Sequence, residues 1–388
     1  MRIFSVSTLL LVLLAGSGLS QSGRRIAAAP SPNPATTEEP DFSETVPLKK
    51  RPPRISPLFR GVGINSKPTL TNATTADTQP ALTEDGEEVV RVETNLITIP
   101  ISVFDRNGLY IPNLTKENFK VFDNGVEQQI EYFGTSEKPF TVVLLIDTSP
   151  STAYKIDEIR LAARAFVDQL KPQDKVAVIE FDGNPQVLTT ATGNREQIYK
   201  AIGKADFGYG TALYDAVDLA LKEHLSQVEG RKAVVLFTDG VDTTSNTANY
   251  DTTLDLAEEF DAPIFPIYYN TFFDTTQRNR PSYPGSRPPL GAGQTAGEYA
   301  VGKKYLEELS AYTGGRIFKP ESTPGGLTAA FEGIAEELRR QYNVGYIPSE
   351  NGTSGQRRSI RIRVDRKNLV VRSRDSYIVG ASVKSPKS

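Results

Sequence analysis

Cysteine is absent from this chain of 388 residues. Its absence excludes disulfides, a thiol nucleophile, a zinc–thiolate site and a lipid-modified cysteine. Histidine occurs once, as His224 in a polar segment, so a serine–histidine–aspartate triad would have to use it. We expect His224 to be a solvated surface residue and the fold to be stabilised by packing alone.

An excess of basic residues is also missing. The chain has 44 Lys and Arg against 47 Asp and Glu, a net charge of -3 and a pI of about 5.6. Nucleic-acid-binding domains usually carry a basic surface, so no nucleic-acid partner is expected.

A long apolar run occurs only at the start of the sequence. Residues 1–20 combine an early Arg2, an apolar stretch over 3–15 and the small residues Gly18 and Ser20. This is the pattern of a secretory signal peptide, and the stretch is shorter than the roughly 20 residues of a membrane helix. We therefore predict a secreted or periplasmic protein with no membrane span in the mature chain.

The remaining sequence changes its periodicity three times. A stretch rich in Pro, Thr and Ala is followed by alternating strands with an Asn124-Gly125 hairpin signal, then by strands that alternate with helices, then by strands again. The predicted segments are a disordered linker over 21–86, a β segment over 87–138, an α/β domain over 139–341, a second β segment over 342–380 and a tail over 381–388.

The α/β domain is expected to be a doubly wound, mostly parallel, Rossmann-like sheet, because its strands are continuous apolar runs of the kind buried on both faces. We expect the two β segments to pair with each other in a small antiparallel domain beside it. The main predicted strands are 141–147, 175–181, 232–238 and 263–269, the helices include 153–170, 212–226 and 302–313, and a long loop is expected over 271–300.

Oxygen-bearing side chains gather where the apolar strands of the α/β domain end. Ligands of such sheets bind at the carboxyl ends of the strands, and two carboxylates with three hydroxyls suit Mg²⁺, Mn²⁺ or Ca²⁺. The candidate metal ligands are Asp147, Ser149, Ser151, Thr211 and Asp239.

These residues resemble a known site. The motif Asp147-x-Ser149-x-Ser151, Thr211 in GTALYDA and Asp239 in TDG look like the metal-ion-dependent adhesion site of von Willebrand factor type A domains. The resemblance implies hydroxyl contacts to the metal from the serines and the threonine, contacts largely through water from the two acids, and a last coordination position for an acidic residue of a partner. The whole layout also resembles the secreted acidobacterial VWFA-related domain family, with Pro150 standing where that family more often has glycine.

Each motif also has a purely structural interpretation. The serines after Asp147 and the hydroxyl of Thr211 are typical helix caps, and TDG is a common end of a strand. Asp182 and Asp242 are expected at the rim of the site. The stretch GEYAVGKK, residues 297–304, nearly spells a phosphate-binding loop but has Lys304 in place of Ser or Thr. The arginines within 357–366 are expected on the solvated face of a strand, with a polyanion-binding face as the alternative.

Two functional classes remain. One is an exported module, not an enzyme, that binds an exposed Asp or Glu of a protein partner through a divalent cation. The other is a metal-dependent hydrolase or an accessory subunit of an envelope enzyme complex, for which only Glu180 or Asp242 could act as a base. The absence of a histidine or cysteine near the site favours binding. The sequence indicates neither the partner nor the metal.

Overall fold

The computed structural model describes residues 42–45, 96–135, 139–152, 155–269, 295–320, 325–350 and 352–380. The predicted signal peptide and tail, and most of the predicted linker, lie outside these ranges. No helix in the described ranges combines the length and the apolar character of a membrane span.

A five-stranded sheet with the order β10-β9-β6-β7-β8 forms the centre of the α/β domain. All neighbouring strands of this sheet run parallel, except β7 and β8, which are antiparallel. This arrangement confirms the predicted doubly wound, mostly parallel sheet. The order reverses beside β6, because the chain runs from β6 to β7 and later returns to β9 on the other side. The strands are β6 (Phe140–Asp147), β7 (Lys175–Phe181), β8 (Pro185–Thr192), β9 (Arg231–Thr238) and β10 (Ile264–Tyr268).

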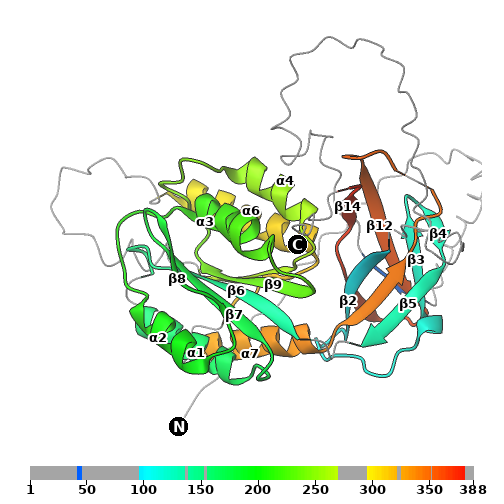
Figure 1. The fold of residues 1–388 in the computed structure, drawn as a ribbon, viewed down its shortest axis with the longest axis horizontal. Coiled ribbons are helices and arrows are strands. Elements are labelled where there is room, and N and C mark those ends of the chain that lie inside the picture. The colour runs from blue at the N-terminus through cyan, green and yellow to red at the C-terminus, as the bar shows by residue number, and fades with distance from the viewer. Residues whose placement is uncertain are drawn as a thin grey trace, which may run out of the picture. The chain divides into compact units, whose positions relative to one another are not determined.

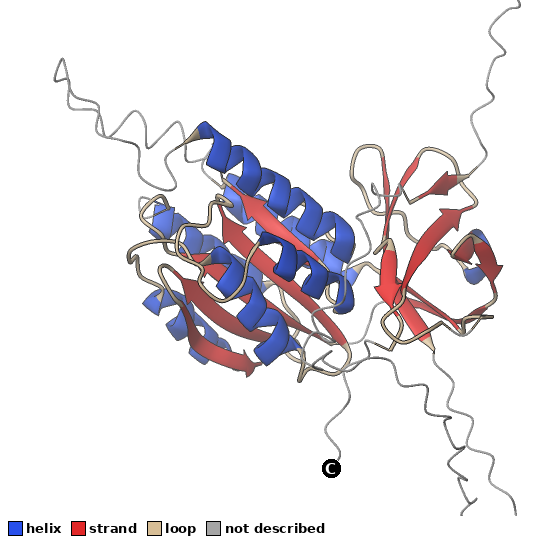
Figure 2. Ribbon diagram, turned by 90° about the horizontal axis from the view of Figure 1, so that it is seen from above, coloured by secondary structure: helices blue, strands red, loops and turns tan. Residues whose placement is uncertain are grey.

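Helices cover both faces of this sheet (Figures 1 and 2). The helices α1, α2 and α7 pack on one face, while α3, its π-helical continuation η4, α4 and α6 pack on the other. Every residue of β6 is buried, as a central strand between two helical layers requires. The helices are α1 (Ile156–Asp168), α2 (Arg195–Lys204), α3 (Leu213–Leu219), η4 (Ala220–Leu225), α4 (Tyr250–Glu259), α6 (Ala296–Thr313) and α7 (Gly326–Arg339).

The β segments before and after the α/β domain pair with each other, as predicted. One sheet has the order β13-β2-β11-β5 and the other β1-β12-β3-β4, with β14 also on β12. Asn124 and Gly125 have positive φ values of 47° and 86° in the β3–β4 turn, which confirms the hairpin. The strands are β1 (Ser43–Glu44), β2 (Ile97–Asp105), β3 (Phe119–Asp123), β4 (Val126–Gln128), β5 (Ile130–Thr135), β11 (Tyr342–Tyr346), β12 (Arg357–Val364), β13 (Leu369–Arg372) and β14 (Ser376–Ile378). A short 3-10 helix η2 (Lys116–Asn118) precedes β3.

A buried ion pair corrects the prediction for the arginines of β12. Arg358 shares the inward face with Ile360, and its Nε donates to the Asp123 carboxylate at 2.8 Å. The hydroxyls of Tyr346 and Tyr377 donate to the other oxygen of Asp123 at 3.1 and 2.9 Å. Arg358 is therefore part of the core, whereas the other arginines of β12 are half-buried.

Two further predictions are wrong in part. Helix α6 begins at Ala296 and not at the predicted residue 302. GEYAVGKK therefore lies in a helix, in agreement with the weak match of this stretch to a phosphate-binding loop. Thr295 caps this helix through a reciprocal pair with Glu298, in which the backbone N–H of each residue donates to the other's side chain. The predicted long loop therefore ends earlier, and residues 271–294 lie outside the described ranges. Within the predicted linker, Ser43 and Glu44 form the strand β1.

Candidate metal centre

Asp147 ends β6 with its carboxylate fully buried. One carboxylate oxygen accepts a hydrogen bond from the backbone N–H of Ser149 at 2.9 Å, and the other accepts one from the hydroxyl of Thr238 at 2.6 Å. Thr238 is the last residue of β9, the neighbouring strand. The carboxyl ends of the two adjacent strands are thus joined through this acid.

The two predicted serines continue from Asp147 towards Asp239. The hydroxyl oxygens of Ser149 and Ser151 lie 3.0 Å apart, and the Ser151 hydroxyl donates to the Asp239 carboxylate at 2.7 Å. The other oxygen of Asp239 accepts from the backbone N–H of Val241 at 3.1 Å, which fixes the turn after β9. Four of the five predicted ligands therefore form one connected cluster.

Thr211 reaches this edge through its loop. Its backbone N–H donates to the Thr243 hydroxyl at 2.9 Å, and its carbonyl accepts from the backbone N–H of Thr243 at 2.9 Å. The same loop is tied to the turn after β6, because the backbone N–H of Gly208 donates to the Thr148 carbonyl at 3.0 Å. The structure thus brings the three predicted loops together, with Thr211 bonded to Thr243 in the loop that follows Asp239, and Gly208 bonded to the turn that follows Asp147.

Glycines allow these loops to pack closely. Gly240, with φ of 84°, forms the turn directly after Asp239. A Cβ atom on Gly302 of α6 would lie 2.3 Å from the Gly240 carbonyl oxygen, so only glycine permits this approach of helix and turn. The position of Asp239 therefore depends on a helix more than 50 residues later in the sequence.

The two carboxylates of the site repel each other. Burial first, and the neighbouring Asp239 carboxylate second, raise the pKa of Asp147 to about 7. In the described ranges, three or more carboxylate, imidazole or thiol groups nowhere gather as a metal site. The cluster has only two carboxylates beside its hydroxyls, a set of hard oxygen donors that fits a divalent cation such as Mg²⁺, Mn²⁺ or Ca²⁺.

The helix-cap interpretations of the predicted ligands do not hold. Helix α1 begins at Ile156 after Lys155, with no side-chain capping bond, and the Ser151 hydroxyl is bonded to Asp239 instead. The residue before α3 is Ala212, again with no side-chain capping bond, so Thr211 does not cap that helix. Neither Ser151 nor Thr211 therefore caps the helix that follows it.

The neighbouring acids hold the loops in place. Asp242 accepts from the backbone N–H of Tyr214 at 3.2 Å and from the Ser245 hydroxyl, and burial raises its pKa. Glu180, at the end of β7, accepts from the backbone N–H of Asp206 at 2.9 Å, and burial raises its pKa as well. Asp182 accepts from the backbone N–H of Asn184 at 3.1 Å. All three stabilise the loops around the cluster.

Two exposed aromatic residues that were not predicted as part of the site lie on the Thr211 loop. Phe207 and Tyr209 retain 59% and 90% of their possible exposure. They flank Gly208, whose backbone is bonded to the turn after Asp147. The signal in the sequence was the segment FGYG, in which aromatic residues alternate with glycines that pack against other loops.

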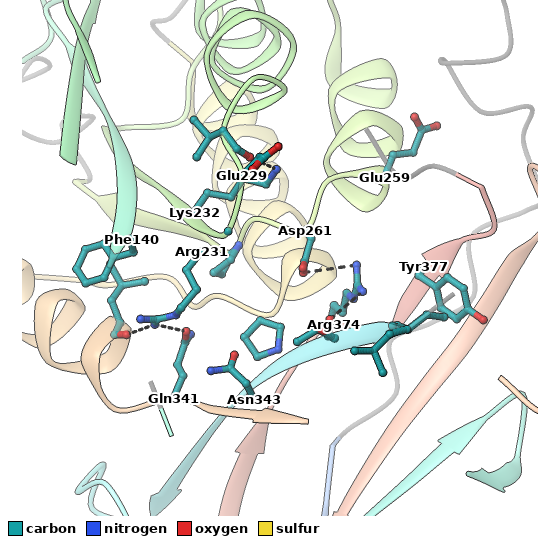
Figure 3. A pocket seen from close by; sticks show the side chains of 18 of the residues that line it. Phe140, Glu229, Arg231, Lys232, Glu259, Asp261, Gln341, Asn343, Arg374 and Tyr377 are labelled. Atoms are coloured by element: carbon teal, nitrogen blue, oxygen red, sulfur yellow. Dashed lines mark hydrogen bonds and ion pairs between the residues drawn. The ribbon is translucent and has the colours of Figure 1, made fainter. Parts of the chain in front are cut away.

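A cavity lies elsewhere in the described part of the chain. A cavity of about 1010 Å³ is lined by the amino ends of β6 and β9 and by residues of β2 and β11 (Figure 3). Arg231 donates there to Gln341 at 3.0 Å, and Arg374 lies 3.6 Å from Asp261. Burial lowers the pKa of Arg231 to about 10. Phe140 opens β6 at this cavity and Asp147 closes the same strand, so the cavity and the candidate metal centre lie at opposite ends of the sheet.

The comparison with known families agrees with the fold. Residues 142–241 match the family model of the von Willebrand factor type A domain. The chain contains a von Willebrand factor type A domain. Relatives of the matched region include the UPF0353 protein MAV335 of Mycobacterium avium, which is 26% identical over an alignment of 192 residues. The alignment covers 44% of this chain and 57% of that protein. The chain thus spans little more than half of that relative.

Solved structures with similar folds are distant from this A domain. A von Willebrand factor type A structure from Catenulispora acidiphila has 13% identity and a TM-score of 0.41 over 76% of this chain and 78% of its own. Proximal thread matrix protein 1 from the mussel byssus, solved with a zinc-occupied MIDAS motif, has 15% identity and a TM-score of 0.40 over 55% and 49%. The assignment of the A domain therefore rests on the family match and on the fold itself.

Proposed function

We propose that this chain is an exported binding protein whose A domain uses a divalent cation to bind an exposed Asp or Glu of a protein partner. The observation that carries the proposal is the unbroken series of contacts from Ser149 through Ser151 to Asp239 at the carboxyl edge of the sheet. The residues that would hold Mg²⁺, Mn²⁺ or Ca²⁺ are Asp147, Ser149, Ser151, Thr211 and Asp239.

The chemistry of the cluster supports binding of one more carboxylate. The cation supplies a positive charge at the edge of the sheet when it is bound. Neutral hydroxyls contribute three of the five proposed ligands, and the family resemblance implies that the two acids act largely through water. Such a cation keeps an affinity for an acidic side chain from outside.

Phe207 and Tyr209 support a protein partner in particular. Aromatic residues that are exposed on a well-anchored loop are frequent hot spots of protein interfaces, because they bury a large area with little loss of conformational entropy. Their loop is bonded to the turn that carries the serines. We propose that the partner covers both aromatic rings while its carboxylate faces the cation.

A hydrolase is the weaker alternative. Glu180 and Asp242, the acids that could serve as a base, are each engaged in hydrogen bonds to backbone N–H groups of neighbouring loops. A general base must be free to reach the water or substrate from which it takes a proton. Export of the chain is also part of the proposal, because it is inferred from the signal-like sequence of residues 1–20 alone.

Selection of peptide ligands tests the binding proposal without a known partner. A random peptide library is incubated with the immobilised chain in Mn²⁺ and eluted with EDTA. We expect the eluted peptides to share an Asp or Glu, and replacement of that residue by Asn or Gln should abolish binding.

Matched variants identify the site in the same assay. Thr211→Ala should lose the selected peptides, whereas Thr190→Ala, which removes an exposed hydroxyl from β8, should keep them. Peptides that bind equally well in EDTA, or that bind Thr211→Ala as tightly as the wild type, would contradict the proposal. Hydrolysis of selected peptides by the wild type but not by Asp147→Ala would favour the enzyme.

A further inference from the structure

Before residue 96, the structure describes only residues 42–45, and these lie on the β domain. Ser43 pairs with Val364 and Glu44 with Arg363, so β1 is an antiparallel neighbour of β12. The backbone N–H of Thr45 donates to the Ile362 carbonyl at 2.9 Å. A short piece of the predicted linker therefore pairs with the last residues of β12, whereas β14 pairs with the first residues of that strand.

Hydroxyl groups extend this strand pairing. The Thr45 hydroxyl accepts from the backbone N–H of Ile362 at 3.1 Å, and the Ser43 hydroxyl accepts from the backbone N–H of Leu369 at 3.0 Å. Thr45 is buried, with 6% of its surface exposed. Both hydroxyls satisfy backbone donors of the domain that would otherwise face solvent at an open edge.

Charge and aromatic contacts complete the recognition of the segment. The Glu44 carboxylate lies 3.4 Å from the Arg363 guanidinium and 3.9 Å from that of Arg361. Arg363 also stacks on the ring of Phe42, 3.8 Å from its centroid, and on Phe122 from β3 at 5.1 Å. Each of the four residues 42–45 thus has a specific contact on the β domain.

The segment is short, and its ion pairs are partly exposed. Pairs of this kind contribute little to stability, and a four-residue strand has few backbone bonds with which to offset its loss of conformational freedom. Residues 46–95 connect it to β2, so it is held beside its site at a high effective concentration. A free peptide of the same chemistry must therefore compete with this tethered segment, and it gains access to the edge when the contacts of the segment are weakened.

We propose that the edge of β12 around Arg361 and Arg363 is a second ligand site, which adds an extended acidic peptide as an antiparallel strand. Residues 42–45 are its built-in occupant, and a peptide with the same order of aromatic, hydroxyl, acidic and threonine side chains replaces them. Strand addition supplies affinity through the backbone, and the arginine–aromatic stack selects the acidic and aromatic side chains. This site is independent of the metal centre.

A peptide-binding assay tests the proposal directly. The probe is a labelled synthetic peptide with the unchanged sequence of residues 40–47, so that the pair of Glu44 and Arg363 is kept. Its binding to the full-length wild type is compared with its binding to the variant Phe42→Ala with Thr45→Ala, in which the contacts of the chain's own segment are weakened.

We expect weak binding to the wild type and at least about tenfold tighter binding when the segment is weakened, because the tethered competitor is weaker. Arg363→Ala, added to the weakened chain, should abolish this gain. Arg366→Ala, which changes an exposed residue just after β12, is the matched control and should keep the gain.

Equal binding to the wild type and to the weakened chain, or equal binding to the Arg363→Ala and Arg366→Ala variants, would overturn the proposal. The double variant Glu44→Cys with Arg363→Cys is a second arm, because the chain has no cysteine of its own. Thr45 and Ile362 are hydrogen-bonded partners, so the adjacent pair of Glu44 and Arg363 is a non-hydrogen-bonded one, with Cα atoms about 4.5 Å apart, and a disulfide accommodates about 4.4 to 6.8 Å. The double variant should form a disulfide within one chain and migrate as a monomer. A disulfide-linked dimer would show that a second copy supplies the occupant, and would overturn the assignment of residues 42–45 to their own chain.

Discussion

Replacing Asp147 with asparagine should stabilise the chain in the absence of metal, although it removes a proposed metal ligand. The carboxylate is fully buried beside Asp239, and its pKa is raised to about 7. An unfolded aspartate has a pKa of about 3.9. The difference of about three units corresponds to a cost of up to about 4 kcal/mol for holding the charge in the metal-free fold.

The sign of the pH dependence follows from the raised pKa. Between about pH 4 and pH 7 the folded chain retains a proton on Asp147 that the unfolded chain has released. The free energy of unfolding of the metal-free wild type should therefore fall as the pH rises through this range and level off above it. Asparagine has no proton to lose, so the contribution from this position should be constant in the variant.

Asparagine also fits the local hydrogen bonds. Its carbonyl can accept from the backbone N–H of Ser149, and its amide can donate to the Thr238 hydroxyl, the two groups that now contact Asp147. At pH 8 in EDTA we expect Asp147→Asn to be more stable than the wild type by about 2 to 4 kcal/mol. For a domain of this size that gain corresponds to roughly 4 to 16 °C in melting temperature.

Urea unfolding from pH 4 to pH 8, with and without Mn²⁺, measures these differences. Asp206→Asn is the control, because it neutralises an exposed acid of the same domain and should change stability by less than about 0.5 kcal/mol. Mn²⁺ should stabilise the wild type and leave Asp147→Asn nearly unchanged. An asparagine variant that is less stable than the wild type at pH 8 in EDTA would refute the reasoning.

Three further results are expected. If the dissociation constant for the cation is about 0.1 to 1 mM, metal at about 100 times that value should stabilise the chain by about 2.7 kcal/mol, a rise of roughly 5 to 11 °C by calorimetry. Tyr209→Ala should weaken binding of the selected acidic peptides by about tenfold or more and leave the affinity for Mn²⁺ unchanged, as measured by titration calorimetry of both ligands. An equal loss of affinity for Mn²⁺ would contradict this prediction. Arg358→Ala leaves the buried Asp123 carboxylate without its cation and should lower the free energy of unfolding, measured in urea, by about 3 to 5 kcal/mol. A change below about 1 kcal/mol would contradict the stabilising role of this ion pair.

The α/β domain could be predicted well because its strands are long apolar runs that only a sheet covered on both faces buries completely. The start of α6 was missed, although Thr295 and Glu298 form a capping-box pattern, because Gly297 and Gly302 weaken the helical signal. Gly302 has a tertiary role against Gly240, which no local pattern reveals.

Long-range polar contacts were the other features that the sequence did not predict. Arg358 alternates with apolar residues in a way that also suits a solvated face, and its partner Asp123 lies 235 positions away. The docking of residues 42–45 likewise depends on β12, more than 300 positions later. In the candidate metal centre, the motifs selected four residues that the structure connects, namely Asp147, Ser149, Ser151 and Asp239. The bond from Ser151 to Asp239 and the anchoring of the Thr211 loop required the structure.

Titration of the metal-stripped chain with Mn²⁺, followed by calorimetry, tests the central claim most directly. The wild type and Thr190→Ala should each bind one ion, and Ser151→Ala and Thr211→Ala should bind it at least about tenfold more weakly, since each loses one hydroxyl from the proposed ligand set. Equal affinity in all four proteins, or no heat of binding in a folded wild type, would contradict a metal centre formed by Asp147, Ser149, Ser151, Thr211 and Asp239.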